Sequence, residues 1–174
     1  MRMFYRKLFS LFRKIYVDFY RKAYGIPKGV EIRGKVFLEA KNITYGQNIT
    51  IFPGVHIWGN GKIVIGDNVS IGKDTIIYAS KEIIIGEDVS IAGQSYIIDC
   101  DHGITRKELI RKQGLISAPI YIGRDSWIGA GVKVLKGSYI SEGVVIGAMG
   151  LVNGFIEPYS INVGIPVKKI AERK

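Results

Sequence analysis

Aliphatic residues that recur every six positions constrain the fold of this chain more than any other feature. In the C-terminal half the spacing continues without a slip through six positions, and a small residue often follows. Neither the 3.6-residue period of a helix nor the alternation of an ordinary strand produces this rhythm, whereas short strands separated by corners do. The positions in phase are Ile122, Ile128, Val134, Ile140, Ile146 and Val152.

Two shorter runs with the same spacing precede this one. The step of eight residues from Ile77 to Ile85 indicates two inserted residues at a corner. Three sides of six residues, about 18 in all, close one triangular coil, and parallel coils that stack share an aliphatic interior. The sequence therefore predicts an all-β domain, a parallel β-helix of about seven coils over residues 30–163. The two runs are Ile65, Ile71, Ile77 and Ile85, Ile91, Ile97.

The rhythm stops at Asp99-Cys100-Asp101-His102-Gly103 and resumes at Ile120. Residues 103–117 are too highly charged to join the interior, so we predict an extruded loop that either covers a neighbouring subunit or stays solvated. Asp101 falls on a hexad position that valines occupy in other coils. We expect it to point inward and to bond His102 or loop backbone, because an unpaired buried carboxylate is costly. The alternative is that the coil has already opened at Asp101.

The first 25 residues carry much of the net charge of +10. They hold seven basic residues against Asp18, a balance of +6, and the remaining +4 is spread over the rest of the chain. This distribution argues against a nucleic-acid-binding face on the main domain. On a helical wheel most of the basic residues lie opposite an apolar side. That side consists of Phe4, Leu8, Leu11, Phe12, Ile15 and Phe19, with Tyr5 and Tyr16 at its margin.

We therefore predict a basic amphipathic helix within residues 1–28, ended by Pro27, and a β-helix domain over residues 29–174. The longest uncharged run, Leu8 to Phe12, is too short for a membrane span or a signal-peptide core. An apolar face opposite a cationic face is typical of peripheral contact with an anionic membrane through residues 1–25. The alternative is that this helix packs on its own β-domain or on a neighbouring subunit.

The repeats resemble those of the hexapeptide-repeat acyltransferases over about residues 63–170. The most specific stretches are 118–132 (APIYIGRDSWIGAGV), 145–148 (VIGA) and 158–170 (PYSINVGIPVKKI), where Val167 replaces the Ala usual in the family. This succession is similar to the maltose-type and xenobiotic-type O-acetyltransferases and to relatives that modify envelope polysaccharides. The resemblance implies a left-handed parallel β-helix, a homotrimer, acetyl-CoA as co-substrate and no metal.

The resemblance also implies the site. His102, at the start of the extruded segment, is the expected general base, because a neutral imidazole can accept the proton of an attacking hydroxyl. Asp99 or Asp101 is expected to orient it, and the sequence leaves the choice open. His56, beside Trp58, is expected on an exposed face and, with Tyr78, is a weaker candidate for the acceptor pocket. The residues expected to bind acetyl-CoA are Gly129, Ala130, Gly147, Ala148, Lys168 and Lys169, although the four small ones also suit coil corners.

The working hypothesis is O-acetylation of a sugar hydroxyl in an envelope glycan or its lipid-linked precursor, at the cytoplasmic face of the membrane. The alternatives are a small soluble acceptor, such as a free sugar or an antibiotic, and a non-catalytic β-helix scaffold. Two histidines and one cysteine argue against the three-histidine zinc site of a γ-type carbonic anhydrase. The lone Cys100 excludes an internal disulfide, fits a reducing compartment, and is expected to be a small core residue.

Overall fold

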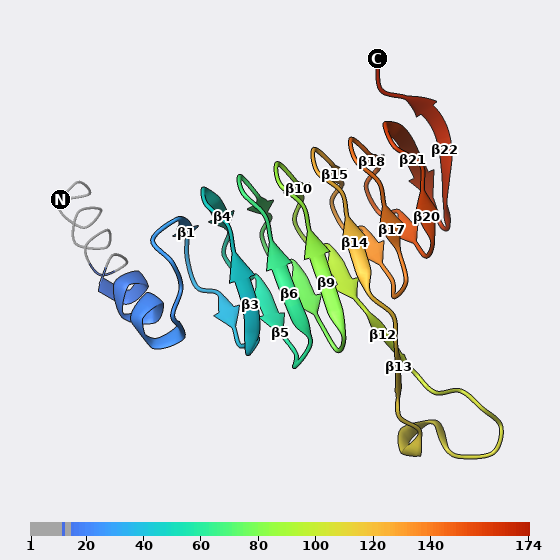
Figure 1. The fold of residues 1–174 in the computed structure, drawn as a ribbon, viewed down its shortest axis with the longest axis horizontal. Coiled ribbons are helices and arrows are strands. Elements are labelled where there is room, and N and C mark those ends of the chain that lie inside the picture. The colour runs from blue at the N-terminus through green and yellow to red at the C-terminus, as the bar shows by residue number, and fades with distance from the viewer. Residues whose placement is uncertain (1–11, 13–14) are drawn as a thin grey trace, which may run out of the picture.

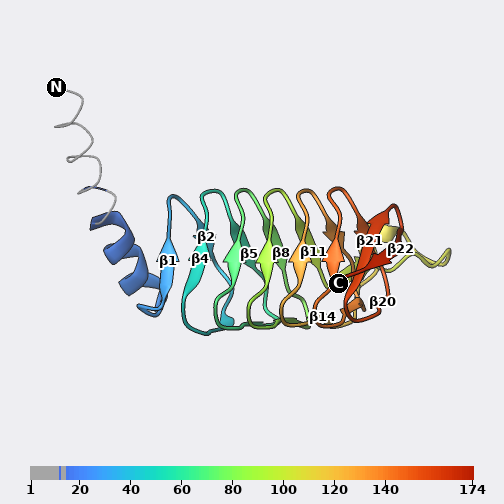
Figure 2. The same cartoon turned by 90° about the horizontal axis from the view of Figure 1, so that it is seen from above.

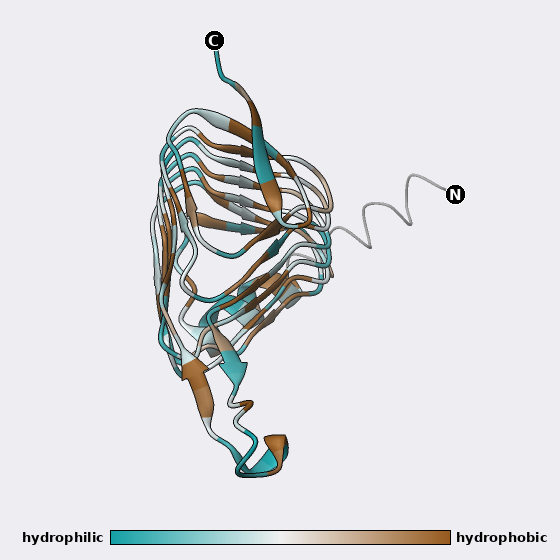
Figure 3. Cartoon of the chain, turned by 90° about the vertical axis from the view of Figure 1, so that its right-hand side faces the viewer, coloured by the Kyte–Doolittle hydropathy of each residue, from teal (hydrophilic) through white to brown (hydrophobic). Residues whose placement is uncertain are grey.

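The computed structural model describes residue 12 and residues 15–174. Short parallel strands stack into a β-solenoid of about seven turns, and the strands line up as three long sheets (Figure 1). Viewed from its C-terminal end, the solenoid has a triangular outline with a hairpin projecting from one corner (Figure 3). The predicted parallel β-helix is confirmed.

Each complete coil contributes one strand to each of the three sheets. The first sheet contains β1 (Val30–Ile32), β4 (Ile49–Ile51), β7 (Ser70–Ile71), β10 (Ser90–Ile91), β15 (Trp127–Ile128), β18 (Val145–Ile146), β21 (Ser160–Gly164) and the antiparallel β22 (Val167–Glu172). The second contains β2 (Phe37–Leu38), β5 (His56–Trp58), β8 (Ile76–Tyr78), β11 (Tyr96–Ile98), β16 (Lys133–Val134) and β19 (Leu151–Val152). The third contains β3 (Asn42–Tyr45), β6 (Lys62–Ile65), β9 (Glu82–Ile85), β14 (Ile120–Ile122), β17 (Tyr139–Ile140) and β20 (Phe155–Ile156).

The coils before and after the hairpin differ in length. Ile63 pairs with Ile83, 20 residues away, whereas Tyr121 pairs with Tyr139, 18 residues away. The two extra residues lie at the corner between the second and third sheets, between β8 and β9, where the sequence predicts an insertion. The preceding coil has the same longer corner, so the insertion is a repeated feature of the early coils.

The interior is one continuous aliphatic column. All twelve in-phase residues identified from the sequence are buried, and the most exposed of them, Ile91, shows only 2% of its surface. Burial of each such side chain contributes about 1.5–3 kcal/mol to folding. The six-residue rhythm is therefore the spacing between successive inward-pointing positions.

The N-terminal helix covers the open end of the first coil (Figure 2). Residues 15–24 are helical, and Val17 and Tyr20 pack against the solenoid core. The Tyr20 hydroxyl accepts a hydrogen bond from the Leu38 amide at 2.9 Å, and the Arg21 guanidinium donates to the Val30 carbonyl. The helix thus caps a row of inward-facing apolar groups that the first coil would otherwise expose.

The apolar side predicted for this helix faces away from the solenoid where it is described. Phe12, Ile15 and Phe19 expose 63%, 58% and 72% of their surface. Phe4, Leu8, Leu11 and Tyr5 lie outside the described residues. Within the described part of the chain, no helix has the length and apolar character needed to cross a bilayer.

The interruption of the repeat is a projecting hairpin (Figure 1). Strand β12 (Cys100–His102) pairs antiparallel with β13 (Leu115–Ser117), and the connection includes a short 3-10 helix η1 (Ile110–Lys112). The predicted extruded segment is therefore present, but it leaves the coil at Cys100 rather than at residue 103. His102 consequently lies in an arm of the hairpin and not in the last ordered coil.

Candidate active site

His102 is exposed on β12, opposite Leu115 of β13, where the hairpin leaves the solenoid. Beside it lies a cavity of about 310 Å³ formed where the outer surface of the second sheet meets the hairpin. Three of its eight lining residues are aromatic and others are apolar, a mixture typical of sites for small organic ligands. The lining residues are Trp58, Tyr78, Tyr96, Ile98, Cys100, Asp101, His102 and Leu115.

Asp99 is fully buried at the corner from which the hairpin departs. One carboxylate oxygen accepts a hydrogen bond from the Ser80 amide at 2.6 Å, and the other accepts from the Lys81 and Glu82 amides, each at 2.7 Å. In the preceding coil the corresponding amide of Gly61 is bound by the carbonyl of Ala79 in the next corner. Because the chain turns away into the hairpin at Asp99, its carboxylate replaces the missing backbone acceptors.

Asp101 does not point inward, so the expectation drawn from its hexad position is wrong. Its side chain is 55% exposed and forms an ion pair with Lys136 at 3.3 Å. The six-residue count fails here because the corner is the longer kind, and Asp99 takes the inward position that Ala79 has one coil earlier. The coil has opened by Asp101, as the alternative reading held. Among the described residues, neither Asp99 nor Asp101 forms a hydrogen bond or ion pair with His102.

Other groups at the hairpin base are protonated and packed. Cys100 is buried as expected, and burial, followed by the nearby Asp99 and Asp101, raises the pKa of its thiol. Burial also raises the pKa of the Tyr96 phenol. The Ser117 hydroxyl donates to the Ser80 hydroxyl at 2.9 Å, which ties β13 to the corner that Asp99 holds. These contacts fix the base of the hairpin and therefore the position of His102.

The four small residues expected to bind acetyl-CoA gather at another corner, between the first and second sheets. Gly129 follows β15, and Gly147 follows β18 one coil later. A Cβ on Gly129 would come within 2.6 Å of the Ala148 amide nitrogen, so close stacking of the coils requires this glycine. Ala130 and Ala148 are exposed. The close stacking of the coils is thus enough to explain Gly129 without a ligand. Ala130 and Ala148, by contrast, are exposed and small, so a ligand could reach the backbone beside them.

This corner and the hairpin corner border opposite edges of the second sheet, because β11 and β16 run between them. The structure thus brings Asp99, Asp101 and His102 together at one edge and the small residues together at the other. Within one copy of the chain, the two groups of predicted site residues lie on different corners of the solenoid.

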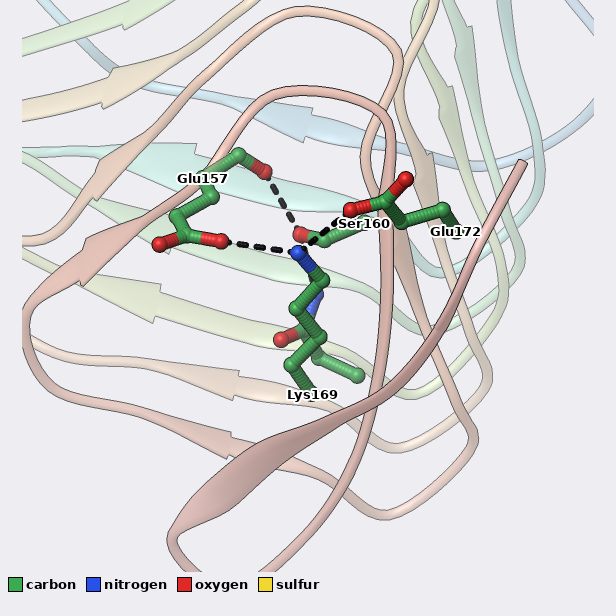
Figure 4. A network of polar contacts seen from close by, with 5 residues as sticks. Glu157, Ser160, Lys169 and Glu172 are labelled. Carbon is green, nitrogen blue, oxygen red and sulfur yellow. Dashed lines mark hydrogen bonds and ion pairs between the residues drawn. The ribbon is translucent and has the colours of Figure 1, made fainter.

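The two predicted phosphate-binding lysines differ in their surroundings. The Lys169 ammonium lies 2.9 Å from the Glu157 carboxylate and 2.8 Å from that of Glu172 (Figure 4). Hydrogen bonds to Glu172 and then Glu157 raise the pKa of Lys169, and Lys169 lowers the pKa of Glu172. Lys168 is exposed and makes no ion pair with the described residues. Lys168 is therefore the lysine whose charge is available to a phosphate.

Sequence reasoning missed Tyr96, Leu115 and Lys136 at this site. Tyr96 follows Ile76 by 20 residues, the length of an early coil, so a search at that period could have placed it on the face that carries Trp58 and Tyr78. Lys136 comes from the coil after the hairpin, and no local signal connects it with Asp101. No group of three or more metal-ligating side chains occurs among the residues that the structure describes.

Comparison with known proteins supports the resemblance seen in the repeats. No family model matches the chain. Over 80 residues it is 45% identical to a probable acetyltransferase of Mycobacterium tuberculosis, a segment that covers 45% of this chain and 27% of that protein. The chain thus spans about a quarter of that relative's length.

Two solved structures have the same fold. The maltose O-acetyltransferase of Clostridium difficile 630 superposes with a TM-score of 0.55 at 28% identity, over 80% of this chain and 71% of that chain. The N-acyltransferase AntD of Bacillus cereus, in complex with dTDP and 3-hydroxybutyryl-CoA, superposes with a TM-score of 0.62 at 25% identity, over 84% and 85%. In sequence and in fold, the chain is similar to the hexapeptide-repeat acetyltransferases.

Proposed function

We propose that this protein is an acetyl-CoA-dependent O-acetyltransferase that modifies a sugar hydroxyl, with His102 as general base. The observation that carries the proposal is the place of His102, exposed at the mouth of an aromatic-lined cavity in a chain similar to acetyltransferases. Aromatic rings pack on the C–H faces of a sugar, and His102 belongs to the same lining, so a sugar bound in the cavity would present a hydroxyl to the imidazole.

In the proposed reaction, a ring nitrogen of neutral His102 takes the hydroxyl proton while the hydroxyl oxygen attacks the carbonyl carbon of the thioester. The tetrahedral oxyanion accepts hydrogen bonds from backbone amides of the corners that contain Gly129 and Gly147. Its collapse breaks the C–S bond, and the imidazolium returns the proton to the departing sulfur. The products are the sugar acetate and coenzyme A, and the histidine ends in its starting state.

The two aspartates have different proposed roles. Asp99 is a positioning residue, because its oxygens are committed to three backbone amides and act on His102 only through the hairpin base. Orientation of the imidazole by a carboxylate stays a prediction for Asp101, whose exposed ion pair with Lys136 can exchange partners. An Asp101→Asn variant tests it: the orienting role requires a lower kcat with an unchanged KM for acetyl-CoA.

The direct test of the base is His102→Ala and His102→Gln, assayed by release of the coenzyme A thiol in the presence of a sugar acceptor. Loss of a general base lowers kcat by about 10²–10⁴-fold and leaves binding of acetyl-CoA intact. Tyr139→Ala, an exposed ring on the third sheet, is the control for a disturbed surface. Turnover in the histidine variants equal to that of the parent protein would contradict the proposal, and no turnover in the parent would favour a scaffold.

A second copy of the chain completes the site in this proposal, because the donor corner and the His102 corner lie apart in a single copy. The assembly is proposed to be the homotrimer. His102→Ala and Ala148→Trp each inactivate one half of the site. When equal amounts of the two variants assemble at random, about one quarter of the sites combine an intact histidine with an intact neighbouring corner. Recovery of about a quarter of the activity supports the shared site, and no recovery contradicts it.

The proposed acceptor is an envelope glycan or its lipid-linked precursor. N-acylation of an amine is the second candidate, favoured by the similarity to the N-acyltransferase AntD, and a small soluble acceptor is a further alternative. Treating the product with neutral hydroxylamine separates the first two, since an ester is cleaved and an amide survives. Retention of the acetyl group after this treatment would overturn O-transfer.

Peripheral membrane contact through residues 1–25, on the inner face of the cytoplasmic membrane, is also proposed. Its support is the exposure of Phe12, Ile15 and Phe19, each of which leaves more than half of its surface uncovered. Ile15→Asp with Phe19→Asp is expected to abolish sedimentation with vesicles that contain anionic lipid. Ile165→Asp, equally exposed at 72% but at the other end of the molecule, is the control. Equal sedimentation of both variants would refute the contact.

A further inference from the structure

A row of aromatic rings runs along the outer surface of the second sheet over four successive coils. We call Phe37, His56, Trp58, Tyr78 and Tyr96 the aromatic row. Phe37 lies opposite His56 in the strand register, and Trp58 lies opposite Tyr78. The ring centroids are 5.4 Å apart for Phe37 and His56, 4.2 Å for His56 and Trp58, and 5.2 Å for Trp58 and Tyr78. The rings from Phe37 to Tyr78 therefore form a continuous path, and Tyr96 joins Tyr78 in the lining of the cavity.

One end of this path is the candidate active site. Trp58, Tyr78 and Tyr96 line the cavity that contains His102, whereas Phe37 lies on the first coil and outside that lining. Strands of adjacent coils are about 4.8 Å apart, so the row spans roughly 14 Å from Tyr96 to Phe37, and Phe37 lies one coil beyond the cavity lining. A ligand that fills the cavity and continues along the sheet would meet one ring after another.

Polar groups accompany the rings. The His56 imidazole lies 3.4 Å from the Glu39 carboxylate, and the Lys35 ammonium lies 5.0 Å from the centre of the Phe37 ring. Phe37 exposes 38% of its surface, and the side chains of His56 and Glu39 expose 35% and 56%. A surface of ring faces bordered by hydrogen-bonding groups suits a ligand that itself has apolar C–H faces and hydroxyl edges.

Stacked rings alone do not indicate a ligand, because parallel register also aligns rings elsewhere in this chain. Tyr121, Tyr139 and Phe155 stack on the third sheet with centroids 4.7 and 5.8 Å apart. The aromatic row differs in its continuity with the His102 cavity and in the His56–Glu39 pair within it. The stack on the third sheet thus supplies a matched control.

We propose that the aromatic row is a binding track for consecutive sugar rings of an acceptor chain, so that the protein acts on oligosaccharides or longer glycans in preference to monosaccharides. The proposal rests on the sugar-acetylating function proposed above and specifies its substrate class. The spacing of the coils is close to the advance per sugar in an extended glycan, so that one sugar can lie over each coil, with His56 and Trp58 both on the second coil. The row occupies four successive coils, so the track has room for about four sugars.

The first experiment measures binding. The chain has two tryptophans, so Trp127→Phe leaves Trp58 as the sole indole and makes emission a reporter of the track. Malto- and chito-oligosaccharides from the monosaccharide to the hexasaccharide are the probes. We expect affinity to rise with length up to the tetrasaccharide. Phe37→Ala should weaken binding of the hexasaccharide by about 5- to 10-fold and leave the disaccharide unaffected, since the disaccharide does not reach Phe37. Tyr139→Ala, in the stack on the third sheet, should leave the affinity for both the hexasaccharide and the disaccharide unchanged.

The second experiment measures transfer from acetyl-CoA to the same series with the otherwise unaltered chain, and size-exclusion chromatography with light scattering checks each variant's assembly. Transfer without any dependence on acceptor length overturns the track and leaves the proposed function standing. Length-dependent binding with no transfer to any sugar overturns the function and leaves the track standing. The binding series also includes the nucleotide sugar dTDP-glucose, and the track is overturned if this is the only compound that changes the Trp58 emission. It is also overturned if Phe37→Ala changes the oligomeric state, because the row would then be a subunit contact.

Discussion

The buried carboxylate of Asp99 offers the sharpest test of how this chain leaves and re-enters its repeat. In Asp99→Asn, the side-chain oxygen can still accept from the Lys81 and Glu82 amides, but the new NH₂ group then faces the Ser80 amide, which also donates. The Ser80 amide therefore loses its acceptor, and the Lys81 and Glu82 amides donate to a neutral oxygen in place of a charged one. An unsatisfied buried donor costs about 1–3 kcal/mol, and a hydrogen bond to a charged group contributes about 1.5–3 kcal/mol.

We therefore expect Asp99→Asn to lower the free energy of unfolding by about 2–4 kcal/mol, since partial exposure of Ser80 and Glu82 lets water compensate in part. The assay is guanidinium denaturation followed by circular dichroism, at one fixed protein concentration because an oligomer's apparent stability depends on it. Asp125→Asn is the matched control: Asp125 is 55% exposed in its ion pair with Arg173, which limits its loss to less than about 1 kcal/mol.

Equal destabilisation by the two aspartate substitutions would refute this reasoning, because it would mean that the three amide contacts contribute no more than a surface ion pair. A loss in Asp99→Asn accompanied by weaker acetyl transfer, but with a normal pH profile of kcat, would agree with a positioning role. A shifted pH profile would instead show that Asp99 acts electrostatically on the base.

Three further predictions concern the cysteine, the donor corner and the lysines. Burial raises the pKa of the Cys100 thiol, so less of the reactive thiolate is present in the folded than in the unfolded chain at a given pH. Iodoacetamide should therefore alkylate Cys100 more slowly in the folded chain at every pH up to about 9. Equal rates would contradict its burial. Gly129→Ala should destabilise the fold by about 1–3 kcal/mol, since its Cβ would meet the Ala148 amide, whereas Gly154→Ala, with open space around it, should stay within about 0.5 kcal/mol in thermal denaturation. Lys168→Ala should raise the KM for acetyl-CoA by several-fold at low salt. The increase should be larger than in Lys169→Ala, because the Lys169 ammonium is already paired with Glu157 and Glu172. A larger increase in Lys169→Ala would mean that the phosphates bind elsewhere.

The repeat explains why so much of the fold was predictable. Positions six residues apart, such as Ile122 and Ile128, must be aliphatic because each side of every coil points one such side chain into the shared interior. Short stretches of sequence show this requirement directly. It was therefore possible to predict the triangular coil, the corner insertion between Ile77 and Ile85 and the extruded segment. His102 was found because it stands where that regular pattern ends.

The errors arose where the outcome depends on contacts between coils. The hexad count placed Asp101 inward, but the longer corner gives that position to Asp99, and only the stacking shows that the Ser80, Lys81 and Glu82 amides need an acceptor there. The exposure of Ile15 and Phe19 likewise depends on which side of the helix meets the first coil. An amphipathic pattern shows that a helix has an apolar side without showing what that side contacts.

The sequence by itself thus determined the solenoid, its interruption and the histidine beside it, because a six-residue period is a local property that each coil repeats. Only the tertiary structure decided the partners of Asp99 and Asp101, the alignment of Phe37, Trp58 and Tyr78 into one row, and the separation of the two groups of site residues onto different corners. These relations join residues 17 or more positions apart. They depend on the stacking of the coils, which no single hexapeptide encodes.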